Sequence, residues 1–152
     1  MAAIEPIPYP DQQIRQILER VKTIALVGAS SNWNRPSYFV MKYLQGKGYR
    51  VIPINPGLAG QTLNGETVYA RLKDIPQDKT GRIDMVDIFR NSADAAAPAL
   101  DAIEIGARFV WMQLDVVNEP AAEKVRAAGL EIVMNHCPAI EYPRLIGGTK
   151  EH

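Results

Sequence analysis

The sequence has few cysteines and no charge of one sign in excess. Its single cysteine, Cys137, can form no internal disulfide, and its 17 lysines and arginines balance its 17 aspartates and glutamates. One cysteine fits a reducing compartment, so we expect the protein to be cytoplasmic. A non-specific nucleic-acid binder normally carries a basic excess, so we do not expect a nucleic-acid partner.

Long hydrophobic runs and metal-ligand spacings are also missing. The apolar runs are the length of a strand, far short of the roughly 18 residues of a membrane span. The start, MAAIEPIPYP, has no basic segment followed by a long apolar one. His136, Cys137 and His152 do not have the spacing of a usual metal site. We therefore expect no membrane segment, no secretory signal and no metal.

What is present suits one globular domain. The chain has 152 residues, 47% hydrophobic and 22% charged, and its 11 glycines and 11 prolines are spread along it. A chain of this length should bury roughly 70% of its unfolded surface. The sequence thus predicts a single domain over residues 1–152, with its core at about 14–145, and neither repeats nor disorder.

Five predominantly apolar runs alternate with segments of helical periodicity, and the first, TIALVG, is uninterrupted. Such runs are typical of strands buried on both faces of a parallel sheet. The predicted strands are residues 23–28, 49–54, 83–89, 108–114 and 130–134, and the predicted helices are 11–21, 36–46, 92–106 and 118–129. A glycine-spaced segment with little regular structure, about residues 57–80, separates the second strand from the third.

This alternation predicts an α/β fold, a Rossmann-like, doubly wound, five-stranded parallel sheet with helices on both faces. We expect the strand order 3-2-1-4-5, counted along the chain, because the chain must turn back beside the first strand to bury the later strands on both faces. A flavodoxin-like order is the alternative, and it keeps most of the functional reasoning.

Ligands of open parallel sheets bind beyond the carboxyl ends of the strands, where the strand order reverses. The segments that follow the five strands are Gly28-Ala29-Ser30-Ser31, Asn55-Pro56, Phe89-Arg90-Asn91, Gln113-Leu114-Asp115 and Asn135-His136-Cys137-Pro138. Taken singly, asparagine, proline and serine are ordinary turn and cap residues. Together these segments gather polar groups and an arginine at one edge, which favours a ligand site there.

The loop after the first strand, GASSNWNRP, departs from the dinucleotide fingerprint. Gly28 is present, but Ser30 and Trp33 stand where the second and third glycines would be. The loop still offers backbone N–H groups, hydroxyls and a helix N-terminus, which suit a phosphate. Arg35, at the start of that helix, is either a bidentate phosphate ligand or a solvated surface residue.

The end of the second strand carries no acid to bind an adenosine ribose. The amide of Asn55 stands where NAD-binding proteins usually have a carboxylate. NAD is therefore disfavoured, and a ligand with a phosphorylated ribose fits better. The positive charges of Arg71, Lys73 and Arg90 could pair with that phosphate group, although Arg71 and Lys73 could equally be solvated surface residues. An NAD(P)-binding redox enzyme or sensor stays open as the alternative.

Six runs of the sequence resemble one family: ALVGAS, NRPSYFVMKYL, GYRVIPINP, DMVDIFRNS, WMQLDVVNE and NHCPAIEYPRL. They resemble the small stand-alone CoA-binding proteins of the YccU-type group, whose fold is similar to the CoA-binding domain of the succinyl-CoA synthetase alpha subunit. The resemblance implies a sheet that binds coenzyme A or a short acyl-CoA without a complete catalytic set. A CoA-binding regulatory partner of a ligase is a further alternative.

The resemblance also implies the binding residues. Gly28, Ala29, Ser30 and Ser31 would face the phosphates together with Arg35, Asn55 and Pro56 would lie by the adenosine, Phe89 and Arg90 would contact the nucleotide, and Gln113 and Leu114 would approach the pantetheine. Asp115 departs from the pattern, because many relatives have a small residue such as glycine there. Its carboxylate either points away from a polyanion or weakens its binding.

No catalytic residue is predicted. His136 and Cys137 are neighbours in an extended segment, where adjacent side chains point to opposite sides, so a mixed disulfide of Cys137 with the CoA thiol is the softer hypothesis. Asp84 and Asp87 are expected to be hydrogen-bond acceptors near helix N-termini or at the sheet edge. The amphipathic first helix and the tail GGTKEH are candidate surfaces for an unknown protein partner.

Overall fold

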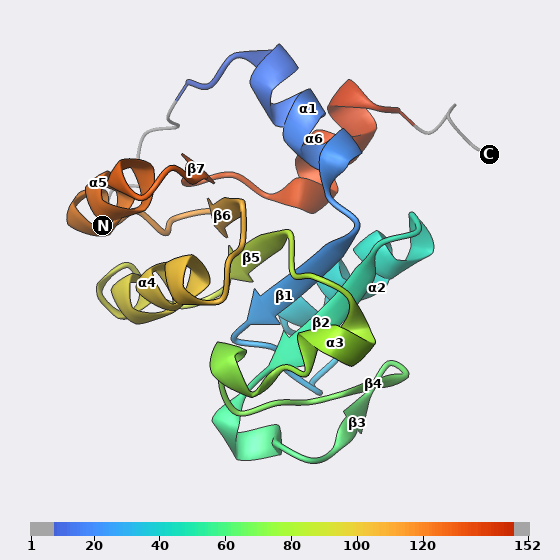
Figure 1. Cartoon of the computed structure of the whole chain (residues 1–152). Helices are drawn as coiled ribbons and strands as arrows, with labels where there is room; N and C mark the ends of the chain where they lie inside the picture. Colours follow the sequence, from blue (N-terminus) through green and yellow to red (C-terminus); the bar gives the residue numbers. More distant parts are fainter. Residues whose placement is uncertain (1–7, 148–152) are drawn as a thin grey trace.

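The computed structural model describes residues 8–147 and is built around one five-stranded parallel sheet (Figure 1). Its strands are β2 (Arg50–Ile54), β1 (Thr23–Val27), β5 (Met85–Ile88), β6 (Phe109–Met112) and β7 (Glu131–Val133), in that spatial order. The predicted strands and the α/β, Rossmann-like, doubly wound class are confirmed. The residues of the tail after Gly147, with His152, lie outside the described part of the chain.

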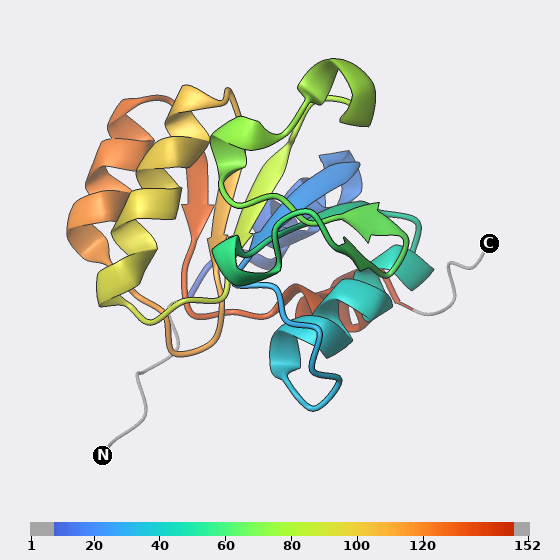
Figure 2. The same cartoon turned by 90° about the horizontal axis from the view of Figure 1, so that it is seen from below.

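Helices cover both faces of the sheet (Figure 2). Alternate strand residues enter two apolar clusters, one on each face. The helices α1 (Asp11–Arg20), α2 (Pro36–Gly46) and α6 (Pro138–Leu145) pack on one face. The helices α4 (Ala96–Glu104) and α5 (Glu119–Ala127) pack on the other. None of the helices within residues 8–147 is long and apolar enough to cross a membrane.

The expected strand order is wrong. Counted along the five strands, the observed order is 2-1-3-4-5, the flavodoxin-like alternative, because β5 pairs with β1 rather than with β2. The connection from β2 to β5 explains this. Its buried residues Leu72 and Ile75 pack on the α4 side of the sheet, opposite to α2. A right-handed crossover on that face carries the chain from β2 across β1 to the far side of β1, where β5 pairs.

The connection between β2 and β5 has more structure than predicted, and α6 was missed. The connection contains the short antiparallel pair β3 (Thr62–Leu63) and β4 (Glu66–Thr67), and the helix α3 (Gln77–Thr80). Pro138, which follows the last predicted strand, is the first residue of α6. A proline is compatible with that position because its missing N–H has no acceptor in the first turn.

Candidate functional site

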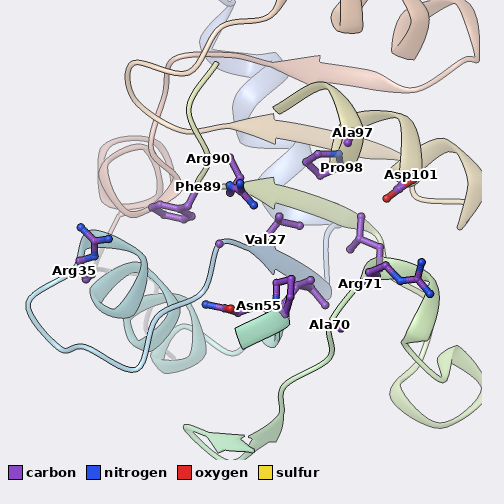
Figure 3. A pocket seen from close by; sticks show the side chains of 14 residues that line it. Val27, Arg35, Asn55, Ala70, Arg71, Phe89, Arg90, Ala97, Pro98 and Asp101 are labelled. Carbon is purple, nitrogen blue, oxygen red and sulfur yellow. The ribbon is translucent and has the colours of Figure 1, made fainter. Parts of the chain in front are cut away.

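A cavity of about 380 Å³ opens at the carboxyl ends of β1, β2 and β5 (Figure 3). The chain leaves β1 toward the face of α2 and leaves β5 toward the face of α4, so this is the point at which the order of the strands reverses. The cavity is lined by Val27, Gly28, Arg35, Ile54, Asn55, Pro56, Ala70, Arg71, Leu72, Phe89, Arg90, Ala97, Pro98 and Asp101.

A second cavity of about 320 Å³ adjoins the first at the start of α2. The two share Gly28, Arg35, Asn55 and Phe89. The smaller one is completed by Ala29, Ser30, Pro36 and Ser37. It therefore lies over the loop that the sequence assigned to phosphate groups, whereas the larger cavity extends toward α4.

Gly28 allows β1 and β5 to end side by side. Its φ is +89°, a conformation that disfavours a side chain. A Cβ at this position would lie 2.3 Å from the carbonyl oxygen of Phe89, so the backbone after β5 passes directly over the glycine. Of the three glycines of the dinucleotide fingerprint, this chain keeps the first, which serves the tight turn after the strand.

Asn55 fixes the loop that follows β1. Its side-chain Nδ2 donates to the backbone carbonyl oxygen of Ala29 at 2.7 Å. Its side-chain Oδ1 accepts from the backbone N–H of Gly57 at 2.7 Å. The N–H groups of Gly28 and Ala29 both donate to the carbonyl oxygen of Ile54. Asn55 lines both cavities, but its side chain already has partners on either side, so it acts as a positioning residue.

The rest of the loop supplies donors with no other acceptor. The backbone N–H groups of Ser30, Ser31 and Ser37 have no hydrogen-bond acceptor among residues 8–147. Ser37 is buried in the first turn of α2, where the helix dipole adds a partial positive charge. The Arg35 guanidinium likewise has no hydrogen bond or ion pair within the described chain. Such a set of donors suits an anion such as a phosphate group.

The larger cavity has more cationic than anionic side chains on its walls. Three arginines, Arg35, Arg71 and Arg90, line it, against one carboxylate, Asp101. Arg90 contacts Asp94 at 3.4 Å, and Arg71 contacts Asp74 at 3.8 Å. Lys73, the other cation considered for a ribose phosphate, is not among the lining residues and pairs with Glu104 at 3.4 Å.

The ends of β6 and β7 are closed by hydrogen bonds within the protein. Gln113 is 6% exposed, and its amide nitrogen, turned toward Asp87, donates to both carboxyl oxygens at 3.0 and 3.2 Å. Asp87 lies in the middle of β5 with no exposed surface, and burial raises the pKa of its carboxyl group well above the usual range. Asp87 does not lie at the sheet edge, because β5 is the central strand of the sheet. Its buried carboxyl group lies near Cys137, the residue that precedes α6.

Asp84 accepts hydrogen bonds, but from a strand rather than from a helix. Its carboxylate accepts the N–H groups of Lys22 and Thr23 at 2.9 and 3.1 Å, at the start of β1. Asp84 thus lies just before β5 and Asp87 lies inside it, and the two side chains share no site. They form no general acid and base pair.

Cys137 does not have the surroundings of a nucleophile. It is 6% exposed, and burial raises the pKa of its thiol. A thiol that stays protonated and covered reacts slowly with a disulfide. The hypothesis of a mixed disulfide with CoA therefore gains no support from the fold.

Neighbouring groups close the same half of the edge. The Trp111 indole donates to the carbonyl oxygen of His136, and the side chain of Asn135 accepts the N–H of Asp115. Glu141, which is buried, contacts His136 and Arg144. Asp115 has a φ of +67°, which explains why glycine fits this place, and its side chain lines neither cavity.

The structure gathers most, but not all, of the predicted binding residues. Six of them line the larger cavity at the ends of β1, β2 and β5, namely Gly28, Arg35, Asn55, Pro56, Phe89 and Arg90. Ala29 and Ser30 line the smaller cavity beside it. Ser31, Gln113 and Leu114 line neither cavity. Leu114 is 49% exposed, so it is accessible from solvent.

Sequence reasoning missed Ser37, Pro98 and Asp101, which also line the cavities. Pro98 and Asp101 lie in α4, the helix that leaves β5. With β5 placed next to β1, the first turns of this helix would have been expected beside the crevice. The signal was therefore the strand order rather than any motif.

Comparisons with known proteins agree on the family and the fold. The profile of a family described as a CoA binding domain matches residues 22–143. YneT of Bacillus subtilis is 35% identical over 125 residues, 82% of this chain and 88% of that protein. A hypothetical protein from Pyrococcus horikoshii OT3 is 40% identical with a TM-score of 0.86, over 97% of this chain and 100% of that one. A Thermus thermophilus structure is 31% identical with a TM-score of 0.83, over 90% and 99%.

Proposed function

This chain belongs to the CoA binding domain family, and from that premise we propose that it binds coenzyme A or a short acyl-CoA where β1, β2 and β5 end. The observation that carries the proposal is the paired cavity over the Gly28 loop, with three arginines on its walls. In this proposal the pyrophosphate group lies over the loop, against Arg35 and the first turn of α2. The adenosine occupies the larger cavity.

The walls of the larger cavity suit a flat base next to charged groups. Val27, Ile54, Leu72 and Pro98 are apolar and lie on different elements around the hollow. An adenine ring gains from burial against such surfaces because apolar area leaves water. The polar groups gather at few points, which is typical of sites that orient a ligand.

The overall charge of the protein gives the ligand no general attraction. The sequence has 17 cationic and 17 anionic side chains, so a polyanion is not drawn in by net charge. Binding must therefore depend on the local N–H groups and on the three arginines of the larger cavity, Arg35, Arg71 and Arg90. The pantetheine arm would continue along the edge toward the exposed Leu114, which the resemblance implies, and would pass the buried Gln113 without contact.

We propose a binding role without catalysis by this chain itself. Among the residues that line the two cavities there is neither a histidine nor a cysteine, and Asp101 is the sole carboxylate. No group of three His, Cys, Asp or Glu side chains within residues 8–147 lies close enough together to hold a metal ion. The CoA-bound protein would then serve as a carrier or a sensor in the cytoplasm, or as the regulatory partner of a ligase.

Thermal unfolding with and without ligand tests the proposal. A ligand at 100 times its dissociation constant adds about 2.7 kcal/mol to the stability of the folded state. For a domain of this size that should raise Tm by roughly 5–10 °C. We expect this shift with CoA and acetyl-CoA. A shift with NAD or NADP and none with CoA would contradict the proposal and favour the dinucleotide alternative.

Replacing Arg35 tests where the phosphate groups lie. We expect Arg35→Ala to weaken CoA binding about tenfold or more in titration calorimetry, because hydrogen bonds to charged groups contribute about 1.5–3 kcal/mol. The parent's affinity should also fall as salt is added. Arg126→Ala is the matched control, since Arg126 pairs with Glu119 on α5 and lines neither cavity. Equal affinities of the two variants for CoA would mean that Arg35 is a solvated surface residue and does not contact the ligand.

A further inference from the structure

We propose that Arg71 recognises the 3′-phosphate group on the ribose of the ligand, which makes the site selective for CoA over nucleotides whose ribose is not phosphorylated. This inference rests on the proposed function, since it assumes that the adenosine lies in the larger cavity. It concerns a different part of the ligand from Arg35, because the 3′-phosphate is separated from the pyrophosphate by the ribose.

The backbone around Arg71 is fixed on both sides. Tyr69 bridges to Ile54 at the end of β2, its N–H donates to the carbonyl oxygen of Pro53 at 3.1 Å, and its carbonyl oxygen accepts the N–H of Asn55 at 2.9 Å. Leu72 is 2% exposed and packs into the core beside α4. The Arg71 side chain therefore starts from a well-held point on the wall of the cavity, although most of the side chain is exposed to solvent.

Arg71 and Arg35 lie at opposite ends of the cavity (Figure 3). Phe89 and Arg90 lie between them, and Asp101 lies at the Arg71 end. A ligand with one anionic group matches only one end of this arrangement. CoA has two separated anionic groups, the pyrophosphate and the 3′-phosphate, and so it can engage both ends.

The Arg71 guanidinium is available to a ligand. Its ion pair with Asp74 is long, 3.8 Å, and joins side chains that are 68% and 41% exposed. Exposed pairs of this kind are screened by water and contribute little. A phosphate dianion offers the planar guanidinium two acceptor oxygens at once, which a hydroxyl group cannot do. A ligand without the 3′-phosphate should therefore bind more weakly, because it lacks the contact with Arg71.

Arg90 and Lys73 are less suited to the same role. Arg90 lies between Arg35 and Arg71 along the cavity (Figure 3) and contacts Asp94 at 3.4 Å. Lys73 is two residues beyond Arg71, but its ammonium group pairs with Glu104 and does not line the cavity. Lys73 thus provides a control cation on the same segment.

The test compares CoA with dephospho-CoA, which differs only in lacking the 3′-phosphate. Titration calorimetry at low salt would be run on the parent, on Arg71→Gln and on Lys73→Gln. We expect the parent and Lys73→Gln to bind CoA about tenfold more tightly than dephospho-CoA. In Arg71→Gln we expect the two affinities to differ by less than about twofold, with the affinity for dephospho-CoA unchanged.

Three results would overturn the inference and leave the proposed function intact: equal affinities for the two ligands in the parent, a preserved preference in Arg71→Gln, or an equal loss of both affinities in that variant. The last would mean that Arg71 shapes the site without reading the phosphate. If the parent binds neither ligand, the proposed function fails first, and the inference fails with it.

Discussion

The carboxyl edge of the sheet has two halves that use similar residues differently. In one, the open half, β1, β2 and β5 end at two cavities, and Arg35 has no partner within the described chain. In the other, the closed half, β6 and β7 end in side chains that bond to one another, such as Gln113 with Asp87. A polar residue after a strand therefore indicates a ligand site only when its own hydrogen bonds are not already made inside the protein.

The path of the chain explains the difference. At the open half the connections diverge, since α2 covers one face of the sheet and α4 the other, which leaves a crevice above the strand ends. At the closed half, α6 follows β7 directly and returns to the face of α1 and α2. Its first residue, Pro138, and Glu141 are buried there, so the polar groups must find partners within the fold.

The largest effect is expected from a side chain at the turn of the open half. In Gly28→Ala the new Cβ would collide with the backbone of Phe89, and a positive φ adds strain. We expect a loss of about 3 kcal/mol or more in the free energy of unfolding, with CoA binding abolished. Urea unfolding measures the loss.

Gly48→Ala is the matched control for this prediction. Gly48 has a similar φ of +99°, but an added Cβ would meet nothing within 4 Å. We expect it to cost about 1 kcal/mol, the strain of the backbone alone. Equal losses in the two variants would mean that the close approach of the Phe89 backbone does not exclude a side chain at position 28.

The closed half should reveal itself through pH. Because burial raises the pKa of Asp87, the folded protein holds a proton that the unfolded chain releases above about pH 4. The contribution of protonated Asp87 to the free energy of unfolding is fully present below that pH. It is lost as the pH rises toward the pKa of the folded state. An asparagine side chain at this position would mimic the neutral carboxyl group. The stability of the variant Asp87→Asn should therefore not fall with rising pH as that of the parent does.

We expect the stability of Asp87→Asn relative to the parent to increase with pH by up to about 1.4 kcal/mol per unit. Urea unfolding at several values between pH 4 and pH 8 measures the difference. A difference that stays constant across this range would show that Asp87 is ionised in the folded protein.

Gln113 decides whether the closed half touches the ligand. Gln113→Met keeps the volume but removes the donor to Asp87, so we expect the protein to lose about 1–3 kcal/mol of stability. CoA affinity should change by less than about twofold, since Gln113 lines neither cavity. A large fall in affinity at unchanged stability would instead support the pantetheine contact implied by the family resemblance.

The smallest effect is expected at the rim of the closed half. Asp115 has a φ of +67°, so Asp115→Gly should relieve strain and add up to about 1 kcal/mol to the free energy of unfolding. The greater freedom of glycine in the unfolded chain offsets part of this gain. Chemical denaturation measures the change, and a clear loss of stability would contradict this account of the position.

The strands and most helices could be predicted because their signal is local. Runs such as TIALV are continuous and apolar, and β1 is buried along its whole length. The strand order could not, because it depends on which face receives Leu72 and Ile75, and nothing in their own segment specifies that face. The order then determines that α4 lies beside the cavity.

The site was predictable to the extent that it follows strand ends. Gly28, Arg35 and Asn55 were found in this way and do line the cavities. Gln113 follows a strand by the same rule, yet its amide faces a buried carboxyl that no sequence pattern reveals. Asp101 reaches the cavity only through the packing of α4.

The most direct test of the account is a backbone amide NMR spectrum of the protein titrated with CoA. We predict that the largest shift changes fall on residues 28–37, together with Asn55, Phe89 and Arg90, at the open half of the edge. Shift changes confined to residues 113–116 and 135–140, or no changes at all at saturating CoA, would contradict the central claim that the open half is the ligand site.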